Sequence, residues 1–327
     1  MPLQRLNTSA SPIARFGLGL AAVGRPGYIN VGRKADLPAD RSVDTMRARA
    51  HQLLDTAYDR GVRYIDAARS YGRAEEFLAT WLRTRPDARD VVIGSKWGYT
   101  YTADWRTDAE VHEVKEHSTS AYDRQLAETR VLLGSRLDLY QIHSVTQDSP
   151  ALTDRALHDR LATLAAEGVT IGLSTSGPGQ AETIRAALAV TVAGEPLFGS
   201  VQATYNVLEP SAGEALAEAH AAGRTVIVKE AMANGRLADR HAIGPDTAVL
   251  REIAQETGAS CDAVALAMVT SRPWVNVVLS GAATVEQLTS NLTAADLRLR
   301  ADQLERLAAL TQPADGYWAH RSRSVWA

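Results

Sequence analysis

The sequence predicts an α/β protein, a (β/α)8 barrel formed by a single domain of 327 residues. Eight short runs rich in β-branched residues recur along the chain, and each is followed by a longer Ala-, Leu-, Glu- and Arg-rich stretch with helical spacing. This alternation is typical of parallel βα units, and eight such units close into a barrel. The competing fold, an open doubly wound sheet, should carry a Gly-x-Gly-x-x-Gly turn after an early strand. Here Gly17-Leu18-Gly19 is followed by Leu20-Ala-Ala, without the third glycine, so the closed barrel is favoured.

The strands and helices can be placed in order along the chain. Strands are predicted near Arg15–Leu20, Val62–Ala67, Val91–Lys96, Leu137–His143, Thr170–Ser174, Ser200–Tyr205, Thr225–Lys229 and Val275–Leu279. Helices are predicted near Ser42–Asp59, Ala74–Thr84, Ser120–Leu133, Asp154–Ala166, Gln180–Val190, Gly213–Ala221, Thr247–Thr257, Cys261–Ser271 and Val285–Leu292. No low-complexity segment, charge block or Pro/Ser-rich linker marks a boundary, so we expect one domain over residues 1–327.

Two long segments interrupt the alternation of predicted strands and helices, one at about 97–119 and one in the tail at about 311–327. Both are rich in aromatic residues, namely Trp97, Tyr99, Tyr101, Trp105, Tyr317, Trp318 and Trp326. Aromatic side chains in long loops often line pockets, although they also pack on a barrel rim. We expect both segments to lie over the barrel mouth.

The composition excludes several classes of protein. The 38 acidic and 35 basic residues give a formal charge of -3, without the clustered cations that bind nucleic acid or an anionic membrane. Residues 1–30 contain no uninterrupted apolar stretch, so neither secretion nor membrane insertion is expected. A lone cysteine, Cys261, permits no intrachain disulfide, which fits a reducing cytoplasm. The eight histidines are scattered, so no metal site is expected, and the oligomeric state is not predicted.

Polar residues end three consecutive predicted strands, where the active sites of such barrels lie. They are Asp66, Lys96 and His143, and Tyr71 follows Asp66 after a short turn. A phenol has a pKa near ~10 in water. We expect Lys96 to lower the pKa of Tyr71, with Asp66 holding the ammonium and a neutral His143 orienting a substrate oxygen. Taken singly, each residue has an ordinary structural alternative, as a helix cap, an ion-pair partner, a rim histidine or a packing residue.

These residues carry a resemblance to a known family. The segment Tyr64-Ile-Asp66-Ala-Ala-Arg-Ser-Tyr71-Gly72-Arg-Ala-Glu75 resembles the Asp-Thr-Ala-x-x-Tyr-Gly-x-x-Glu signature of the aldo-keto reductase superfamily, with Ala67 where Thr is common. Ser95-Lys96 is similar to the family's lysine segment, and Asp138-Leu-Tyr-Gln-Ile-His143 to its histidine segment. The resemblance covers essentially the whole chain. It implies NAD(P)H-dependent reduction of an aldehyde or ketone, with Tyr71, Asp66, Lys96 and His143 as catalytic residues and Tyr71 supplying the proton.

The same resemblance implies a set of cofactor-binding residues. They are Gly19, Leu20, Asp66, Ser174, Gln202, Lys229, Glu230, Gly281, Thr284, Gln287 and Asn291. Thr175 stands where the family usually has Asn, and Lys229 stands where an aromatic residue or Arg often covers the nicotinamide. For Lys229 and Glu230, a structural ion pair and cofactor contact are both open. The segment 279–291 has no basic residue for a 2′-phosphate, and Gln287 stands where Arg is common. NADP(H) is expected as the preferred cofactor, with NAD(H) as the alternative.

Substrate contacts are expected from His143 and from three aromatic residues of the long connections, Trp97, Tyr99 and Trp318. For the nearby pair His117-Ser118, we expect Ser118 to start a helix and His117 to be solvated. The substrate would be a small carbonyl compound, such as a sugar. Two other functions remain open from the sequence. One is a cofactor-binding sensor or accessory protein with slow turnover, and the other is a lyase or aldolase that uses Lys96 as a Schiff-base amine.

Overall fold

The computed structural model describes residues 3, 6, 11–29, 36–242, 244 and 247–324. Eight parallel strands close into a barrel in the spatial order β1, β12, β11, β10, β7, β6, β3 and β2. These strands are β1 (Phe16–Gly19), β2 (Tyr64–Asp66), β3 (Val92–Trp97), β6 (Leu139–Val145), β7 (Thr170–Thr175), β10 (Ser200–Thr204), β11 (Thr225–Lys229) and β12 (Val277–Ser280). The predicted (β/α)8 barrel is confirmed, and each of the eight predicted strands overlaps an observed one.

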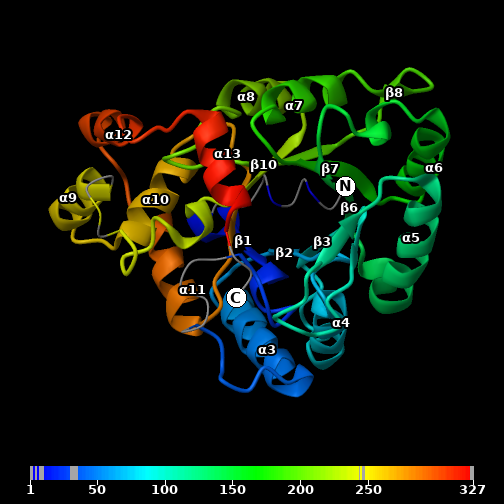
Figure 1. Cartoon of the computed structure of the whole chain (residues 1–327), viewed down its shortest axis with the longest axis horizontal. Coiled ribbons are helices and arrows are strands. Elements are labelled where there is room, and N and C mark those ends of the chain that lie inside the picture. Colours follow the sequence, from blue (N-terminus) through cyan, green and yellow to red (C-terminus); the bar gives the residue numbers. More distant parts are fainter. Residues whose placement is uncertain are drawn as a thin grey trace.

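Helices surround the strands and cover the outside of the barrel (Figure 1). They are α3 (Val43–Asp59), α4 (Ala74–Thr84), α5 (Thr119–Leu133), α6 (Arg155–Ala166), α7 (Gln180–Leu188), α8 (Gly213–Ala221), α9 (Ala248–Thr257), α10 (Cys261–Thr270) and α11 (Val285–Leu292). All nine were predicted. Two further helices, α12 (Ala301–Ala308) and α13 (Ala314–Ser322), were not. Over the described part of the chain, no helix is both long and apolar enough to cross a membrane.

Side chains at helix N-caps fix where several of these helices begin. Ser118 Oγ accepts a hydrogen bond from the Ala121 amide at 3.1 Å at the start of α5, which confirms the predicted role of Ser118. Thr284 Oγ1 accepts one from the Gln287 amide at 3.2 Å at the start of α11. Each cap satisfies an N–H group that has no partner within the helix.

A buried cluster fills the inside of the barrel beneath the strand ends that carry the predicted site. It consists of Leu3, Leu6, Tyr64, Val92, Leu139, Ile227, Val277 and Leu279. The Tyr64 phenol donates to Asp66 Oδ1 at 3.1 Å. Gly94 on the neighbouring strand makes room for this phenol, because a Cβ at position 94 would lie 2.4 Å from Tyr64 Oη. The packed interior therefore supports Asp66 directly.

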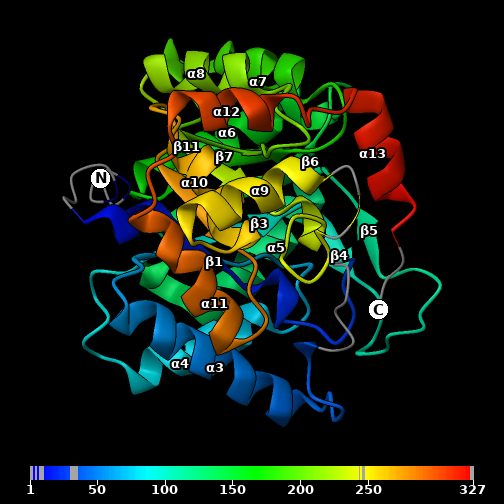
Figure 2. The same ribbon diagram turned by 90° about the vertical axis from the view of Figure 1, so that its left-hand side faces the viewer.

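The two aromatic-rich connections contain secondary structure that the sequence analysis missed. Within residues 97–119, β4 (Tyr99–Tyr101) and β5 (Glu113–Lys115) form an antiparallel hairpin. Figure 2 shows this hairpin and α13 at the same end of the barrel. A second hairpin joins β8 (Thr191–Val192) to β9 (Glu195–Pro196). Strands of two or three residues are too short for a sequence pattern to reveal.

Candidate active site

Three of the predicted catalytic residues meet at the ends of β2 and β3. Lys96 is fully buried, and its Nζ donates to Asp66 Oδ2, to the Ala67 carbonyl at 3.1 Å and to Tyr71 Oη at 3.4 Å. Tyr71 reaches this point because it lies in the loop between β2 and α4. The lysine therefore lies between the carboxylate and the phenol, as the sequence analysis expected.

The Asp66 carboxylate is held by further donors from inside the barrel. Its Oδ1 accepts hydrogen bonds from Tyr64 Oη at 3.1 Å, from Gln202 Nε2 at 2.9 Å and from Gln141 Nε2 at 3.5 Å. Asp66 is only 1% exposed, so these bonds replace the water that a buried carboxylate loses. Tyr64 and Gln141 are supporting residues that the sequence analysis did not single out.

The pKa of the Tyr71 phenol is raised, whereas the sequence analysis expected it to be lowered. Burial raises the pKa of Tyr71 well above its ordinary value, and the nearby Asp66 carboxylate raises it further. The Lys96 ammonium, 3.4 Å from Tyr71 Oη, favours the phenolate, but burial and the Asp66 carboxylate outweigh this effect, so the expected net lowering of the pKa does not occur. Arg25 acts in the opposite direction to burial, and its guanidinium lies 5.4 Å from the centre of the Tyr71 ring. The phenol therefore keeps its proton at neutral pH.

His143, at the end of β6, lies beside the Tyr71 phenol. The two rings are 5.5 Å apart and nearly perpendicular, and the Tyr99 ring packs on the imidazole at 5.1 Å. Burial lowers the pKa of His143 well below its ordinary value, and nearby cations lower it further, Lys96 and Lys229 foremost. The imidazole is thus neutral at pH 7, as expected, and can donate one hydrogen bond and accept another.

A measurable consequence follows from this neutral imidazole. With a neutral carbonyl substrate and saturating cofactor, kcat/KM is expected to change by less than about twofold between pH 7.5 and pH 6, because His143 does not gain a proton in this range. The pH profile of initial rates checks this expectation, with thermal unfolding measured across the same range as the control. An acidic limb with a midpoint near pH 6.5 would contradict it.

His117 is a second histidine of the site, and the expectation that it is solvated is wrong. It is only 5% exposed, since the turn after β5 packs it beneath His143. Its Nε2 lies 2.9 Å from the His143 carbonyl, and its Nδ1 lies 2.6 Å from Ser149 Oγ. Burial lowers the pKa of His117 to about 4. The neutral ring therefore donates to His143 O and accepts from Ser149, which fixes the backbone that carries His143.

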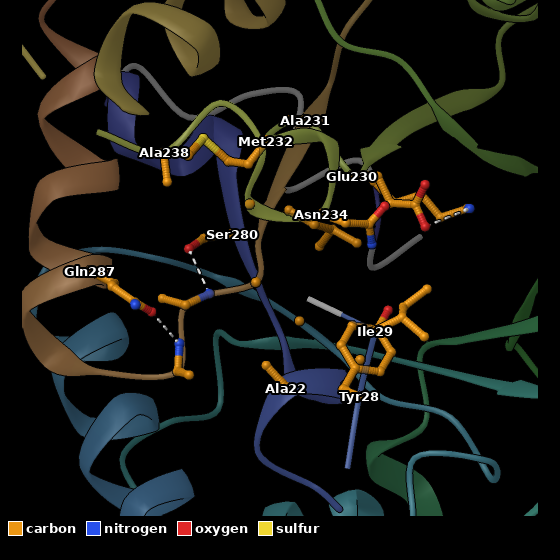
Figure 3. A pocket seen from close by; sticks show the side chains of 18 of the residues that line it. Ala22, Tyr28, Ile29, Glu230, Ala231, Met232, Asn234, Ala238, Ser280 and Gln287 are labelled. Atoms are coloured by element: carbon orange, nitrogen blue, oxygen red, sulfur yellow. Dashed lines mark hydrogen bonds and ion pairs between the residues drawn. The ribbon is translucent and has the colours of Figure 1, made fainter. Parts of the chain in front are cut away.

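An elongated cavity of about 490 Å³ begins at Tyr71 and His143, which we call its reaction end, and extends to the start of α11. In Figure 3, Ala231, Met232 and Asn234 form one wall, and Ala22, Tyr28 and Ile29 face them. Ten of the predicted site residues line it, namely Gly19, Asp66, Tyr71, His143, Gln202, Lys229, Glu230, Gly281, Gln287 and Asn291. The cavity thus joins three of the four predicted catalytic residues, all but Lys96, to most of the predicted cofactor residues.

Three predicted cofactor residues are not part of the cavity wall. Leu20 is fully buried in the hydrophobic core, because the chain turns into a short 3-10 helix after β1. Ser174 is also fully buried, and its Oγ accepts a hydrogen bond from the Ser144 amide at 2.8 Å. Thr284 uses its hydroxyl to cap α11. Each of these side chains has a structural role, and its contact with a cofactor stays a prediction.

None of the three aromatic residues predicted to contact substrate lines the cavity, and their contacts with a substrate stay predictions. Trp97 is fully buried against the Tyr122 ring, with ring centres 5.2 Å apart, and does not line the cavity. Tyr99 faces His143, and Trp318 is 7% exposed beside Tyr317, but neither lines the cavity. The reaction end is lined by charged side chains that the sequence analysis had not expected together, namely Arg25, Glu113, Lys229, Glu230 and Arg321. The sequence did not indicate this, because β5 and α13, which carry two of them, were not predicted.

The structure shows Lys229 and Glu230 in an ion-pair network and in the cavity wall at once. Lys229 Nζ donates to Thr204 Oγ1 at 3.0 Å, and Thr204 Oγ1 donates to Glu230 Oε2 at 3.0 Å. Arg321 of α13 donates to the same carboxylate, with its Nε 2.9 Å from Glu230 Oε1 and 3.0 Å from Oε2. The nearby Arg321 and Lys229 charges lower the pKa of Glu230 to about 2. This network ties α13 to the end of β11.

The opposite end of the cavity lies at the N-terminus of α11. Gln287 Oε1 accepts a hydrogen bond from the Ala283 amide at 2.9 Å, and Ser280 Oγ accepts one from Asn291 Nδ2 at 2.8 Å (Figure 3 shows Gln287 and Ser280). A helix N-terminus attracts anions through its N–H groups and its dipole. Four charged side chains also line this end, namely Asp36, Asp239, Arg240 and Asp262.

The chain is similar to known proteins over most of its length. A family model described as "Aldo/keto reductase family" matches residues 38–312. An uncharacterized oxidoreductase of Mycobacterium bovis is 28% identical over 318 residues, which cover 90% of this chain and 88% of that protein. An aldo-keto reductase of Strobilurus tenacellus is 22% identical, with 96% of this chain and 94% of the relative covered.

Solved structures show the same fold. The holo form of an aldo-keto reductase from Bacillus halodurans superposes with a TM-score of 0.66 at 20% identity, covering 92% of this chain and 93% of the other. A putative aldo-keto reductase from Pseudomonas aeruginosa superposes with a TM-score of 0.60 at 23% identity, covering 86% and 89%. At these identities the likeness concerns the fold alone.

Proposed function

Because the family match over residues 38–312 shows that the chain belongs to the aldo/keto reductase family, we propose that it is a NAD(P)H-dependent reductase of an aldehyde or ketone. The observation that carries this proposal is the chain of contacts from Asp66 through Lys96 to Tyr71, at one end of a cavity of about 490 Å³ that also reaches the start of α11. The substrate class we propose is a small polar carbonyl compound such as a sugar, since charged side chains line the reaction end.

The substrate oxygen would lie between Tyr71 and His143. In this position the neutral imidazole can donate a hydrogen bond that orients and polarises the carbonyl. The Tyr71 phenol, which burial keeps protonated, supplies the proton to the oxygen as negative charge develops there. The Lys96 ammonium, 3.4 Å from Tyr71 Oη, stabilises the phenolate that forms, and Asp66 holds this ammonium in place.

We propose that the cavity holds a nicotinamide dinucleotide, which would supply the hydride to the carbonyl carbon. Gln202 lines the cavity, and its Oε1 is buried without a hydrogen-bond partner among the described residues. Such an oxygen is an acceptor for the N–H group of a carboxamide. At the far end, Gly281 and Gln287 would hold the adenosine half near the N-terminus of α11.

We propose NADPH as the preferred cofactor, because of the family resemblance, and NADH as the alternative. Arg240 lines the far end, where it is paired with Asp36, and could meet a 2′-phosphate. Asp239 and Asp262 line the same end and would favour the free hydroxyl of NADH. The preference for NADPH or NADH therefore depends on the balance of charges at this end of the cavity. Binding measurements with both cofactors determine which is preferred.

A Schiff-base mechanism has less support from the structure. Lys96 is fully buried, does not line the cavity and donates to three acceptors. An amine nucleophile must reach a substrate carbon, which this position does not allow.

Cofactor binding tests the proposal. Titration of the purified protein with NADPH and with NADH is expected to quench tryptophan fluorescence saturably, at one site per chain, for at least one of the two. N-acetyltryptophanamide titrated in parallel corrects for light absorption by the cofactor. Absence of saturable binding for both would contradict the proposed function.

A further inference from the structure

At the reaction end of the cavity, three cations are each paired with a carboxylate. The pairs are Lys96 with Asp66, Arg25 with Glu113 and Arg321 with Glu230. The Arg25 pair has a separation of 2.8 Å, and Arg321 approaches both oxygens of Glu230. Each pair is close to neutral as a unit, so none of them gives this end of the cavity a strong net charge.

Lys229 is the fourth cation of this end, and among the described residues no fourth carboxylate balances its charge. Its Nζ donates one hydrogen bond, to the neutral hydroxyl of Thr204, and lies 3.9 Å from a Glu230 oxygen that Arg321 already binds. Burial lowers the pKa of Lys229 to about 8, which agrees with an ammonium that has lost water without gaining a full counter-charge. The reaction end therefore carries a surplus positive charge in the wall formed by the end of β11.

This surplus matters because the two redox states of a nicotinamide dinucleotide differ in charge. Both states carry the same phosphates, but the oxidised ring has one positive charge that the reduced ring lacks. Under the proposed function, which this inference rests on, the ring must lie at the reaction end, since the carbonyl it reduces is held by Tyr71 and His143. A like charge within the same cavity repels the oxidised ring only.

We propose that Lys229 makes this chain bind the reduced dinucleotide more tightly than the oxidised one, and so biases the site toward carbonyl reduction and release of the oxidised cofactor. Phosphate contacts cancel in this comparison, because they are common to both redox states. At the effective dielectric of a protein interior, one charge in the same cavity is worth roughly a factor of ten in affinity.

The test compares dissociation constants of the reduced and oxidised forms of both dinucleotides, measured by calorimetry, for the wild-type protein and for Lys229→Gln. The wild-type protein is expected to bind the oxidised form roughly tenfold more weakly than the reduced form. In Lys229→Gln this ratio is expected to approach one, mainly because the oxidised form gains affinity. Lys115→Gln is the matched control, since it removes the same charge from a residue that does not line the cavity, and it should keep the wild-type ratio.

A ratio in Lys229→Gln equal to that of the wild type would overturn the inference. If this unchanged ratio came with an equal loss of affinity for both redox states, it would place the Lys229 ammonium on the pyrophosphate. If the folded wild-type protein binds neither redox state of either dinucleotide, the proposed function fails first, and the inference fails with it. The two failures are therefore distinguishable.

The wild-type protein offers a second readout that needs no variant to fold. The ratio is expected to shrink between pH 7 and pH 9, because Lys229, with a pKa of about 8, loses its charge in this range. The charged and titratable groups near it include Glu230, Arg321, Lys96, Asp66 and His143, and the pKa of His143 lies well below this range. Glu230 has a pKa of about 2 and Arg321 a pKa above its ordinary value, so neither titrates in this range. A ratio constant across the range would overturn the inference.

Discussion

Replacement of Tyr71 by Phe is expected to lower kcat for carbonyl reduction by about 10³-fold while leaving the fold intact. The variant keeps the ring that packs against His143 but loses the proton that the alkoxide needs. Steady-state rates with saturating cofactor measure the effect. The dissociation constant of the cofactor is expected to change by less than about threefold, since the phenol acts on the substrate oxygen.

The matched control for this variant is Tyr101→Phe. Tyr101 is half-buried in β4 and does not line the cavity, so loss of its hydroxyl should leave kcat within about twofold of the wild type. If Tyr71→Phe keeps more than a tenth of wild-type turnover, the phenol is not the main proton source, and the proposed mechanism is wrong.

The second large effect concerns the buried pair of Lys96 and Asp66. Lys96→Met is expected to lower kcat by at least 10²-fold, because the ammonium no longer stabilises a phenolate at Tyr71. It is also expected to lower the free energy of unfolding by about 3 kcal/mol, because the Asp66 charge stays buried without its cation. Urea unfolding and steady-state rates measure the two effects separately.

The double variant Asp66→Asn/Lys96→Met separates stability from chemistry. With both charges removed, most of the lost stability should return, whereas turnover should stay low. Lys115→Met is the control for loss of a lysine, since Lys115 lies on β5 outside the cavity lining and makes one hydrogen bond, to Thr146. Wild-type turnover in the double variant would contradict the assigned role of Lys96.

Much of the fold and the centre of the site could be predicted from the sequence. Parallel strands place their last residues at one end of the barrel, so an acid, a lysine and a histidine at three consecutive strand ends had to converge. The structure brings Asp66, Lys96 and His143 together in this way, and Tyr71 joins them from the next loop. The capping roles of Ser118 and Thr284 were readable for a similar reason, because they depend only on local spacing.

The cavity wall was harder to predict, because it depends on which way loop side chains point. Trp97 is the last residue of β3, and its ring packs on α5 at Tyr122, outside the barrel. Successive strand residues point to opposite faces, so a shift of one position exchanges a lining residue for a core residue. Arg25 was not singled out at all, and its place beside Tyr71 depends on Glu113 in a hairpin with no clear sequence pattern.

The acidity of the phenol was also misjudged for a physical reason. The sequence places Lys96 next to Tyr71, and a neighbouring ammonium alone lowers the pKa of a phenol. It does not show that the Tyr71 phenol is itself buried, or that the Asp66 carboxylate acts on this phenol as well as on the lysine. Burial and the Asp66 charge outweigh the ammonium and raise the pKa of Tyr71. This direction suits a residue that must hold its proton until an alkoxide forms.

The measurement that tests the central claim most directly is a single turnover with the wild-type protein in excess over a reduced dinucleotide deuterated at C4. With a set of small polar aldehydes and ketones, we expect at least one alcohol product that carries the deuterium on its carbinol carbon. The same transfer should be at least about 10²-fold slower in Tyr71→Phe. A protein that binds the cofactor saturably but transfers no deuterium to any of these carbonyls would contradict the account and indicate a cofactor-binding sensor.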